Sequence, residues 1–242
     1  MSWFSKVEYR ASSRDPAGHR ELARMLDNPY YQHQRLWTLF DQPPGSTRPF
    51  LFHHQLDAAR PGQAAFWMIS TLQPQAPEPG WTIRSKPYHP AFRAGQRLAF
   101  QLRVNPSVKR LGTNGKSQRY DPIALALQAL PALQRAAERQ RWIHRELAPW
   151  LAARGATYGF DLEIDRTVVL RYEPLRFPGG RSGREIRLSV ADFRGVLRVR
   201  DPLRFGEAAI AGVGHARGFG CGALLLKPVR EAATRHAGEE EE

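Results

Sequence analysis

Hydrophobic and polar positions along the first hundred residues predict several short strands around one helix. Residues 1–10 alternate loosely between apolar and polar side chains, which is typical of a strand. Asn28-Pro29 predicts a helix start, because Asn caps free amides and proline loses no needed donor at the first helical position; the helix should run to about Phe40. Further strands are expected at 50–56, 65–72 and 97–104, with a Pro-rich, turn-forming stretch at 74–90. The order β-α-β-β-(irregular)-β is most of a ferredoxin-like unit.

The second half of the chain predicts a similar unit with a longer helix. Helical periodicity covers residues 123–154, interrupted at Pro131, and Gly155 is the expected stop. Apolar residues of one parity predict strands at 162–170, 186–190, 193–199 and 223–226, and Asp201-Pro202 repeats the helix-start signal. We therefore predict an α+β protein of two tandem ferredoxin-like domains, residues 1–120 and 121–235. The acidic tail at 236–242 should be solvated and disordered.

Charge and cysteine content narrow the classes of partner. The formal net charge of +13 over 242 residues creates a positive field that concentrates polyanions, which favours nucleic acid. An anionic membrane is disfavoured, because the basic residues are scattered over predicted strands and loops. The single cysteine, Cys221, excludes an internal disulfide and Cys-rich metal sites. With no signal-peptide-like or membrane-spanning stretch in the sequence, we expect a cytoplasmic protein.

The segment GVGHARGFGCG, residues 212–222, holds five glycines immediately before an apolar run. A phosphate loop of the dinucleotide or P-loop type follows a strand and opens a helix, whereas this segment follows a predicted helix and precedes a strand. A helix C-cap would account for Gly212 or Gly214 but not for all five. The remaining glycines predict unusual backbone angles or the close approach of another chain.

The spacing of these glycines resembles the glycine-rich loop of the repeat-associated RNA-binding proteins of CRISPR systems. The wider stretch 193–228 is similar to the C-terminal part of one branch, the CasE endoribonucleases of type I-E Cascade complexes. NPYYQHQRLWTLF, residues 28–40, resembles the first helix of the same family, and FQLRVNPSVKR, residues 100–110, is a further match. These matches occur in an order that fits the family's two ferredoxin-like domains.

The resemblance implies a metal-independent endoribonuclease without a cofactor, which binds the stem-loop of CRISPR repeat RNA and cleaves precursor transcripts into mature guide RNAs. In that reaction a ribose 2′-hydroxyl attacks the adjacent phosphate and leaves a 2′,3′-cyclic phosphate and a 5′-hydroxyl. The implied partners are the repeat hairpin, the mature crRNA and other Cascade subunits, with no membrane. One alternative is a noncatalytic RNA-binding scaffold subunit. Another, from a different functional class, is a small DNA-binding or assembly protein.

His33 lies at the position of the family's catalytic histidine, and a histidine suits proton transfer because its pKa lies near working pH. Tyr30, three residues earlier, shares the helical face and is placed to orient the phosphate or share proton transfer. If the helix begins one residue later, Tyr31 takes this role in place of Tyr30. Without the resemblance, His33 continues an apolar face and is typical of a core histidine. No spacing in the sequence supports a metal site.

Basic residues around this helix are expected to contact RNA phosphates, although each alone is also consistent with a solvated turn. One group follows the strand that ends at Asn105, and a second lies in or beside the turn FPGGRSGR, whose family counterpart binds the repeat stem. A-form RNA is recognised by shape and backbone, which suits arginines on a protruding ribbon. The glycine segment should let the RNA backbone pass close to the domain interface, and His215 is a further candidate contact. The expected RNA-binding residues are Lys109, Arg110, Lys116, Arg119, Arg176, Arg181, Arg184, Arg187, Gly212, Gly214, Arg217, Gly218, Gly220 and Gly222.

Overall fold

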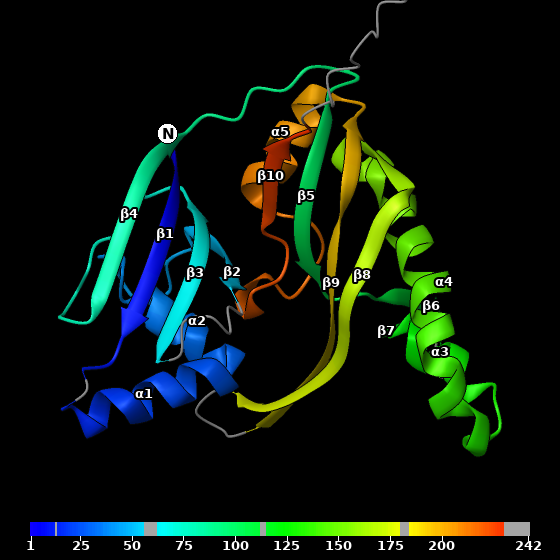
Figure 1. Cartoon of the computed structure of the whole chain (residues 1–242), viewed down its shortest axis with the longest axis horizontal. Helices are drawn as coiled ribbons and strands as arrows, with labels where there is room; N and C mark the ends of the chain where they lie inside the picture. The colour runs from blue at the N-terminus through cyan, green and yellow to red at the C-terminus, as the bar shows by residue number, and fades with distance from the viewer. Residues whose placement is uncertain (13, 56–61, 112–114, 180–183, 230–242) are drawn as a thin grey trace, which may run out of the picture.

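The structure is a computed structural model that describes residues 1–12, 14–55, 62–111, 115–179 and 184–229. Figure 1 shows two sheets side by side, each with its own helices. Within the described residues lie two four-stranded sheets and one two-stranded sheet, and every strand pair is antiparallel. The α+β class is therefore confirmed. Arg181 and the tail 236–242 lie outside the described residues, and only the backbone of Arg184 is described.

The first sheet has the order β2-β3-β1-β4 and packs against two helices. Its elements are β1 (Ser2–Arg10), α1 (Pro16–Asp27), α2 (Pro29–Trp37), β2 (Phe50–Gln55), β3 (Gln63–Ser70) and β4 (Trp81–Tyr88). Leu36 of α2 is fully buried against Phe52 and Phe66 of the sheet. The predicted helix start is confirmed, since the Asn28 side chain accepts hydrogen bonds from the amides of Tyr30 and Tyr31. The helix ends at Trp37, three residues before the predicted end.

The Pro-rich stretch contains a strand that the sequence did not predict. Residues 81–88 form β4 at the edge of the first sheet, where Pro87 is tolerated because an edge strand leaves half of its amides unpaired. A second missed element is α1, whose start repeats the cap-plus-proline signal: the Asp15 side chain accepts from the Ala17 amide and Pro16 is the first helical residue.

The second sheet has the order β10-β5-β9-β8 and packs on the remaining helices. Its elements are β5 (Arg97–Val104), α3 (Pro122–Gln128), α4 (Ala132–Tyr158), β8 (Phe160–Gly179), β9 (Arg184–Val199), α5 (Pro202–Ala211) and β10 (Leu224–Pro228). The strand at 97–104 is confirmed, but its expected place in the first unit is wrong. It pairs with β9 and β10, because Leu98, Phe100 and Leu102 are buried in the second core.

The long helix is confirmed with two differences. Pro131 separates α3 from α4, as predicted, but α4 ends at Tyr158, with Gly159 in the left-handed conformation at φ 76°. Gly155 is instead a close-packing position, since a Cβ there would lie 2.1 Å from the carbonyl oxygen of Phe160. The loop predicted after Asn105 holds a small hairpin of β6 (Val108–Leu111) and β7 (Ser117–Tyr120).

Candidate active site

The candidate site lies where α2, the glycine segment and the far end of the β8–β9 ribbon meet. Figure 1 shows β8 and β9 curving down toward α1 and α2. The Asn28 side-chain amide donates to the carbonyl oxygen of Pro178 over 3.4 Å. Phe177 packs edge-on against Phe219 of η1, the short 3-10 helix Arg217–Phe219, with ring centroids 5.3 Å apart. These contacts join the ribbon both to the start of α2 and to the glycine segment.

His33 projects from α2 and is half-buried between Trp37 and Phe50, with ring centroids 6.2 Å and 5.7 Å away. The indole Nε1 of Trp37 donates a hydrogen bond to His33 Nε2 over 3.1 Å. Because an indole N–H can only donate, Nε2 must accept, and a neutral His33 imidazole carries its proton on Nδ1. That Nδ1 is buried and has no hydrogen-bond partner among the described residues.

The free Nδ1 of His33 faces Arg48 across Gly218. A Cβ built on Gly218 would lie 3.3 Å from Arg48 Nη1 and 3.9 Å from His33 Nδ1, so both groups converge on one point. Arg48 is held there by its Nε, which donates to the carbonyl oxygen of Phe50 over 2.8 Å. The sequence did not predict Arg48, because nothing in the local pattern of TRPFLF separates it from other arginines that precede a strand.

Positive charge at this point is not neutralised by protein carboxylates. Burial, together with the positive charge of Arg48, lowers the pKa of His33 to about 4. Burial and the charge of Arg217 lower the pKa of Arg48. Neither arginine forms an ion pair with a carboxylate in the described part of the chain. The Arg48 guanidinium and the Nδ1–H of His33, with Arg217 near enough to act on Arg48 and no carboxylate partner for either arginine in the described residues, form a site suited to a phosphate.

The two candidate tyrosines differ in their surroundings. Tyr31 packs against the first core, and the Arg24 guanidinium lies 4.1 Å from the centre of its ring. Tyr30 is half-buried, and no hydrogen bond joins its hydroxyl to another described residue. Since α2 begins at Pro29, Tyr30 and His33 lie on one helical face, as predicted. The catalytic roles of both residues stay predictions.

The glycine segment packs closely on the first sheet and on itself. A Cβ would lie 2.7 Å from Leu51 Cδ1 at Gly212 and 3.1 Å from the Phe52 ring at Gly220. At Gly222 it would lie 2.8 Å from the carbonyl oxygen of Val213, and all three glycines have positive φ angles. The close approach that these glycines permit is therefore made by β2 and by the segment's own backbone, and no second polypeptide or RNA strand is needed to explain it. Gly214 faces open space, whereas a Cβ at Gly218 would contact both Arg48 and His33.

The predicted basic groups of the β6–β7 hairpin and the β8–β9 ribbon are linked by Arg119, which lines a cavity with members of each group. Lys109 and Arg119 are opposite one another in β6–β7 and are exposed, and Arg176 and Arg187 are opposite one another in β8–β9 and are also exposed. Arg119 lines two cavities. One, of about 470 Å³, is also lined by Arg176 and Arg187, and the other, of about 370 Å³, is also lined by Lys109. The exposed residues Arg110 and Lys116 belong to or adjoin the same hairpin. Contact of any of them with RNA stays a prediction.

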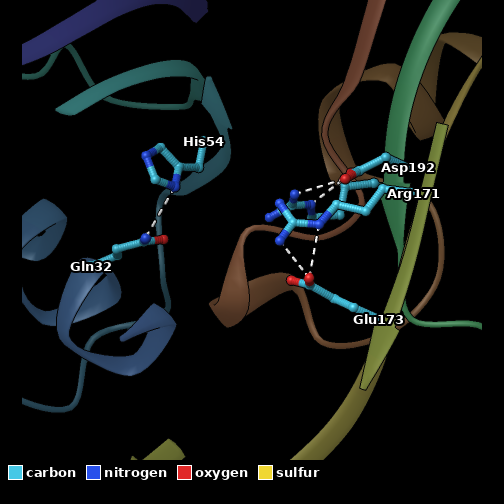
Figure 2. Close-up of polar contacts among 6 residues, drawn as sticks. Gln32, His54, Arg171, Glu173 and Asp192 are labelled. Atoms are coloured by element: carbon cyan, nitrogen blue, oxygen red, sulfur yellow. Dashed lines mark hydrogen bonds and ion pairs between the residues drawn. The ribbon is translucent and has the colours of Figure 1, made fainter. Parts of the chain in front are cut away.

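A separate polar cluster lies between the two sheets, and Figure 2 shows its members. Gln32 Nε2 donates to His54 Nδ1 over 3.1 Å, and Arg103 forms a bidentate pair with Asp192 at 2.7 Å and 2.8 Å. Arg171 Nε donates to Glu173 over 2.8 Å. Burial and the charge of Arg103 lower the pKa of His54 to about 4, which keeps it neutral at pH 7. The charged groups are paired here, unlike those beside His33.

The described residues contain neither a metal cluster nor a membrane-spanning helix. There, no three His, Cys, Asp or Glu side chains gather in a way that would hold a metal ion. Among the described helices, none is both long enough and apolar enough to cross a membrane.

Comparison with known proteins identifies relatives over nearly the whole chain. A family model described as CRISPR associated protein matches residues 2–228. The CRISPR-associated endoribonuclease Cse3 of Thermus thermophilus is 29% identical, over 93% of this chain and 100% of its own. The CRISPR system Cascade subunit CasE of Escherichia coli is 30% identical, over 86% of this chain and 96% of its own. A solved structure of CRISPR endoribonuclease Cse3 bound to 19 nt RNA superposes with a TM-score of 0.68 at 25% identity, covering 94% and 99% of the two chains.

Proposed function

Because this chain belongs to the CRISPR associated protein family, we propose that it is a site-specific endoribonuclease that binds the stem-loop of CRISPR repeat RNA and cuts precursor transcripts into guide RNAs. The named activity of the Thermus relative and the RNA in the similar solved structure support this function. The Escherichia coli relative is named as a Cascade subunit, which supports assembly of this chain with other Cascade subunits. The +13 net charge suits an RNA partner.

The strand orders support the proposal of two tandem ferredoxin-like units. Numbered in chain order within each unit, both sheets have the order 2-3-1-4, read in opposite directions. Each unit also has helices between its first and second strands. Because β5 pairs in the second sheet, we place the division between the units at residues 89–96, ahead of the predicted boundary at 120. The solvated, disordered acidic tail at residues 236–242 stays a prediction.

The observation that carries the proposed chemistry is the convergence of His33 Nδ1 and Arg48 Nη1 beside Gly218. The scissile phosphate is bound at this point, with its non-bridging oxygens toward Arg48 and Arg217. These guanidinium groups stabilise the negative charge that accumulates on the phosphate in the transition state. Gly218 is required because any larger side chain would occupy the space of the phosphate.

The protonation state of His33 determines which proton it can transfer. As the O2′–P bond forms, the 2′-hydroxyl loses a proton, and as the P–O5′ bond breaks, the leaving oxygen gains one. The anionic phosphate favours the charged imidazolium and raises the pKa of His33 from about 4 toward the range useful for catalysis. In the imidazolium both ring nitrogens carry a proton, so protonation at Nε2 displaces the hydrogen bond from Trp37, and the Nδ1–H donates to the leaving 5′-oxygen. The proton of the 2′-hydroxyl passes to solvent water, and Tyr30 orients the phosphate or relays that proton.

Cleavage of a repeat transcript in excess chelator tests this proposal. The expected products carry a 2′,3′-cyclic phosphate and a 5′-hydroxyl, and mass analysis of the product ends identifies both. No step assigned to the side chains needs a metal ion. A requirement for Mg²⁺ would contradict the proposed chemistry, and tight binding of an uncut hairpin would favour the scaffold subunit.

A further inference from the structure

A second basic site lies beside the glycine segment, where His215 is close enough to Arg217 for the Arg217 charge to act on it. It is a cavity of about 370 Å³ between the β6–β7 hairpin, the end of α4 and the start of the glycine segment. Its positive side chains are Lys109, Arg119 and Arg154, with His215 at its edge. None of the residues that line the cavity is an aspartate or a glutamate.

The guanidinium of Arg154 is half-buried in this cavity, and no carboxylate among the described residues pairs with it. Its Nη1 donates to the carbonyl oxygen of Trp150 over 2.8 Å, and its Nη2 donates to that of Ser107 over 2.6 Å. The Trp150 ring lies 3.7 Å below it. These contacts hold the group in place but do not neutralise it, and burial lowers the pKa of Arg154. A cation held out of water without an anion is costly in the free protein, and a bound anion offsets that cost.

Charges from several elements act on His215. Burial lowers its pKa, and Arg119, Arg217, Lys109 and Arg154 lower it further. In the described part of the chain, Lys109, Arg119 and Arg154 form no ion pair with a carboxylate. The Tyr158 hydroxyl accepts from the Gly214 amide over 2.8 Å and so keeps its own proton free to donate. Donors and positive charges thus surround the cavity on several sides.

Arg217 connects this cavity with the site at His33. Its charge lowers both the pKa of Arg48 and the pKa of His215. Its Nε donates to the carbonyl oxygen of Gly214, which lines the cavity. A strand whose phosphate lies at Arg48 can therefore continue past Arg217 and place its next phosphates near His215.

We propose that this cavity binds a phosphate of the single-stranded RNA that flanks the scissile phosphate, an inference that rests on the proposed function. The recessed position of Arg154 favours a single strand over the stem. A duplex presents its phosphates on a convex surface, whereas a flexible strand can turn a phosphate inward. The cavity then sets which RNAs bind best: a hairpin with flanking nucleotides binds more tightly than the hairpin alone.

Affinity measurements with two RNAs test this inference. One is the bare repeat hairpin and the other is the same hairpin with single-stranded nucleotides on both sides, and both carry a 2′-deoxy group at the cleavage site. The wild-type protein should gain affinity from the flanks. Arg154→Gln should lose most of that gain, and its salt dependence with the flanked RNA should flatten by about one unit of log–log slope.

Two further variants make the result interpretable. Lys109→Gln combined with Arg119→Gln should also reduce the gain, and these exposed residues carry little risk to folding. Arg93→Gln removes an equal charge from an exposed position in the 89–96 segment and should leave the gain unchanged. Thermal melts check that each variant is folded.

The outcomes separate this inference from the proposed function. Variants that keep the full gain, or a wild type that shows none, overturn the flanking-strand site alone. Equal losses for both RNAs assign the cavity to the stem and also overturn it. A wild-type protein that binds neither RNA contradicts the proposed function, and this inference with it.

Discussion

The indole Nε1 of Trp37 donates a hydrogen bond to Nε2 of His33 over 3.1 Å, between residues one turn apart on α2. This bond fixes the tautomer of the neutral imidazole and leaves its Nδ1 proton directed at the space beside Gly218. The apolar stripe of a helix thus positions a reactive group, and the same histidine both packs against aromatic rings and keeps one nitrogen free.

Trp37→Phe should slow cleavage by on the order of 10- to 100-fold, because the imidazole is no longer held in one orientation and tautomer. The pH at which the cleavage rate changes should rise as well, since the indole donor favours the neutral form of His33. The single-turnover pH–rate profile measures both effects. A role for Trp37 in packing alone predicts a lower melting temperature with an unchanged profile.

Arg48→Gln should reduce single-turnover cleavage by about 10²- to 10³-fold, as expected when a donor to a developing anion is lost. Affinity for the hairpin should fall far less, because binding is spread over many phosphate contacts. In the free protein the pKa of His33 should rise from about 4, because a neighbouring positive charge is removed. Histidine NMR titration measures this change.

The matched control is Arg93→Gln, which removes a charge from an exposed site away from His33. It should change neither cleavage nor the His33 titration. An Arg48→Gln protein that cuts at the wild-type rate would show that Arg48 does not contact the reacting phosphate.

Stability should depend on pH through three histidines, one buried and two half-buried. His33, His53 and His54 each have a pKa lowered to about 4, by burial first and by nearby arginines second. Their unfolded pKa lies near 6.5, so the unfolded chain binds more protons between these values. The free energy of unfolding should therefore fall as the pH drops from about 6.5 to 4. Urea unfolding at a series of pH values measures the slope.

A histidine variant identifies the source of that slope. His53→Gln should make the fall shallower, since one proton is then no longer taken up on unfolding, whereas His89→Gln at an exposed position should not. The Glu8 carboxylate, whose pKa is lowered to about 2 chiefly by its bond with Lys6, contributes only at lower pH. Stability that is constant from pH 6.5 to 4 would contradict the assignment.

Gly212→Ala should destabilise the protein more than Gly214→Ala. Both glycines have positive φ, of 86° and 80°, so each substitution costs about 1 kcal/mol of backbone strain. Only at Gly212 does the new Cβ meet a neighbour, Leu51, which adds roughly 1 to 3 kcal/mol. Chemical denaturation of the two variants compares these costs. Equal losses in the free energy of unfolding would show that β2 moves away from the new Cβ at no energetic cost.

Local signals made the helix starts predictable. Asn28-Pro29 and Asp201-Pro202 each combine a capping side chain with a proline that has no donor to lose, and both helices begin there. The same signal at Asp15-Pro16 was available and marks α1. Such signals act within one turn, and this is why the sequence alone locates them.

Pairing between distant strands was not predictable in this way. β5 has the alternation expected of any half-buried strand, and only its contact with β9 and β10 shows which sheet it joins. Arg48 was missed for the same reason, since it lies near His33 only because α2 packs on the start of β2, where His33 contacts Phe50 and Arg48 bonds to the Phe50 carbonyl. His33 was identified through the family resemblance, because its helical pattern alone also fits a core histidine.

Single-turnover cleavage of a hairpin repeat RNA by His33→Ala in excess chelator decides whether His33 takes part in the reaction. Affinity for the 2′-deoxy RNA and a thermal melt are recorded for the same protein. If His33 transfers a proton to the reacting phosphate group, cleavage falls by about 10²-fold or more while affinity and melting temperature stay near wild type. A variant that still cuts within a few fold of wild type, or one whose lost cutting is matched by lost folding, contradicts the claim.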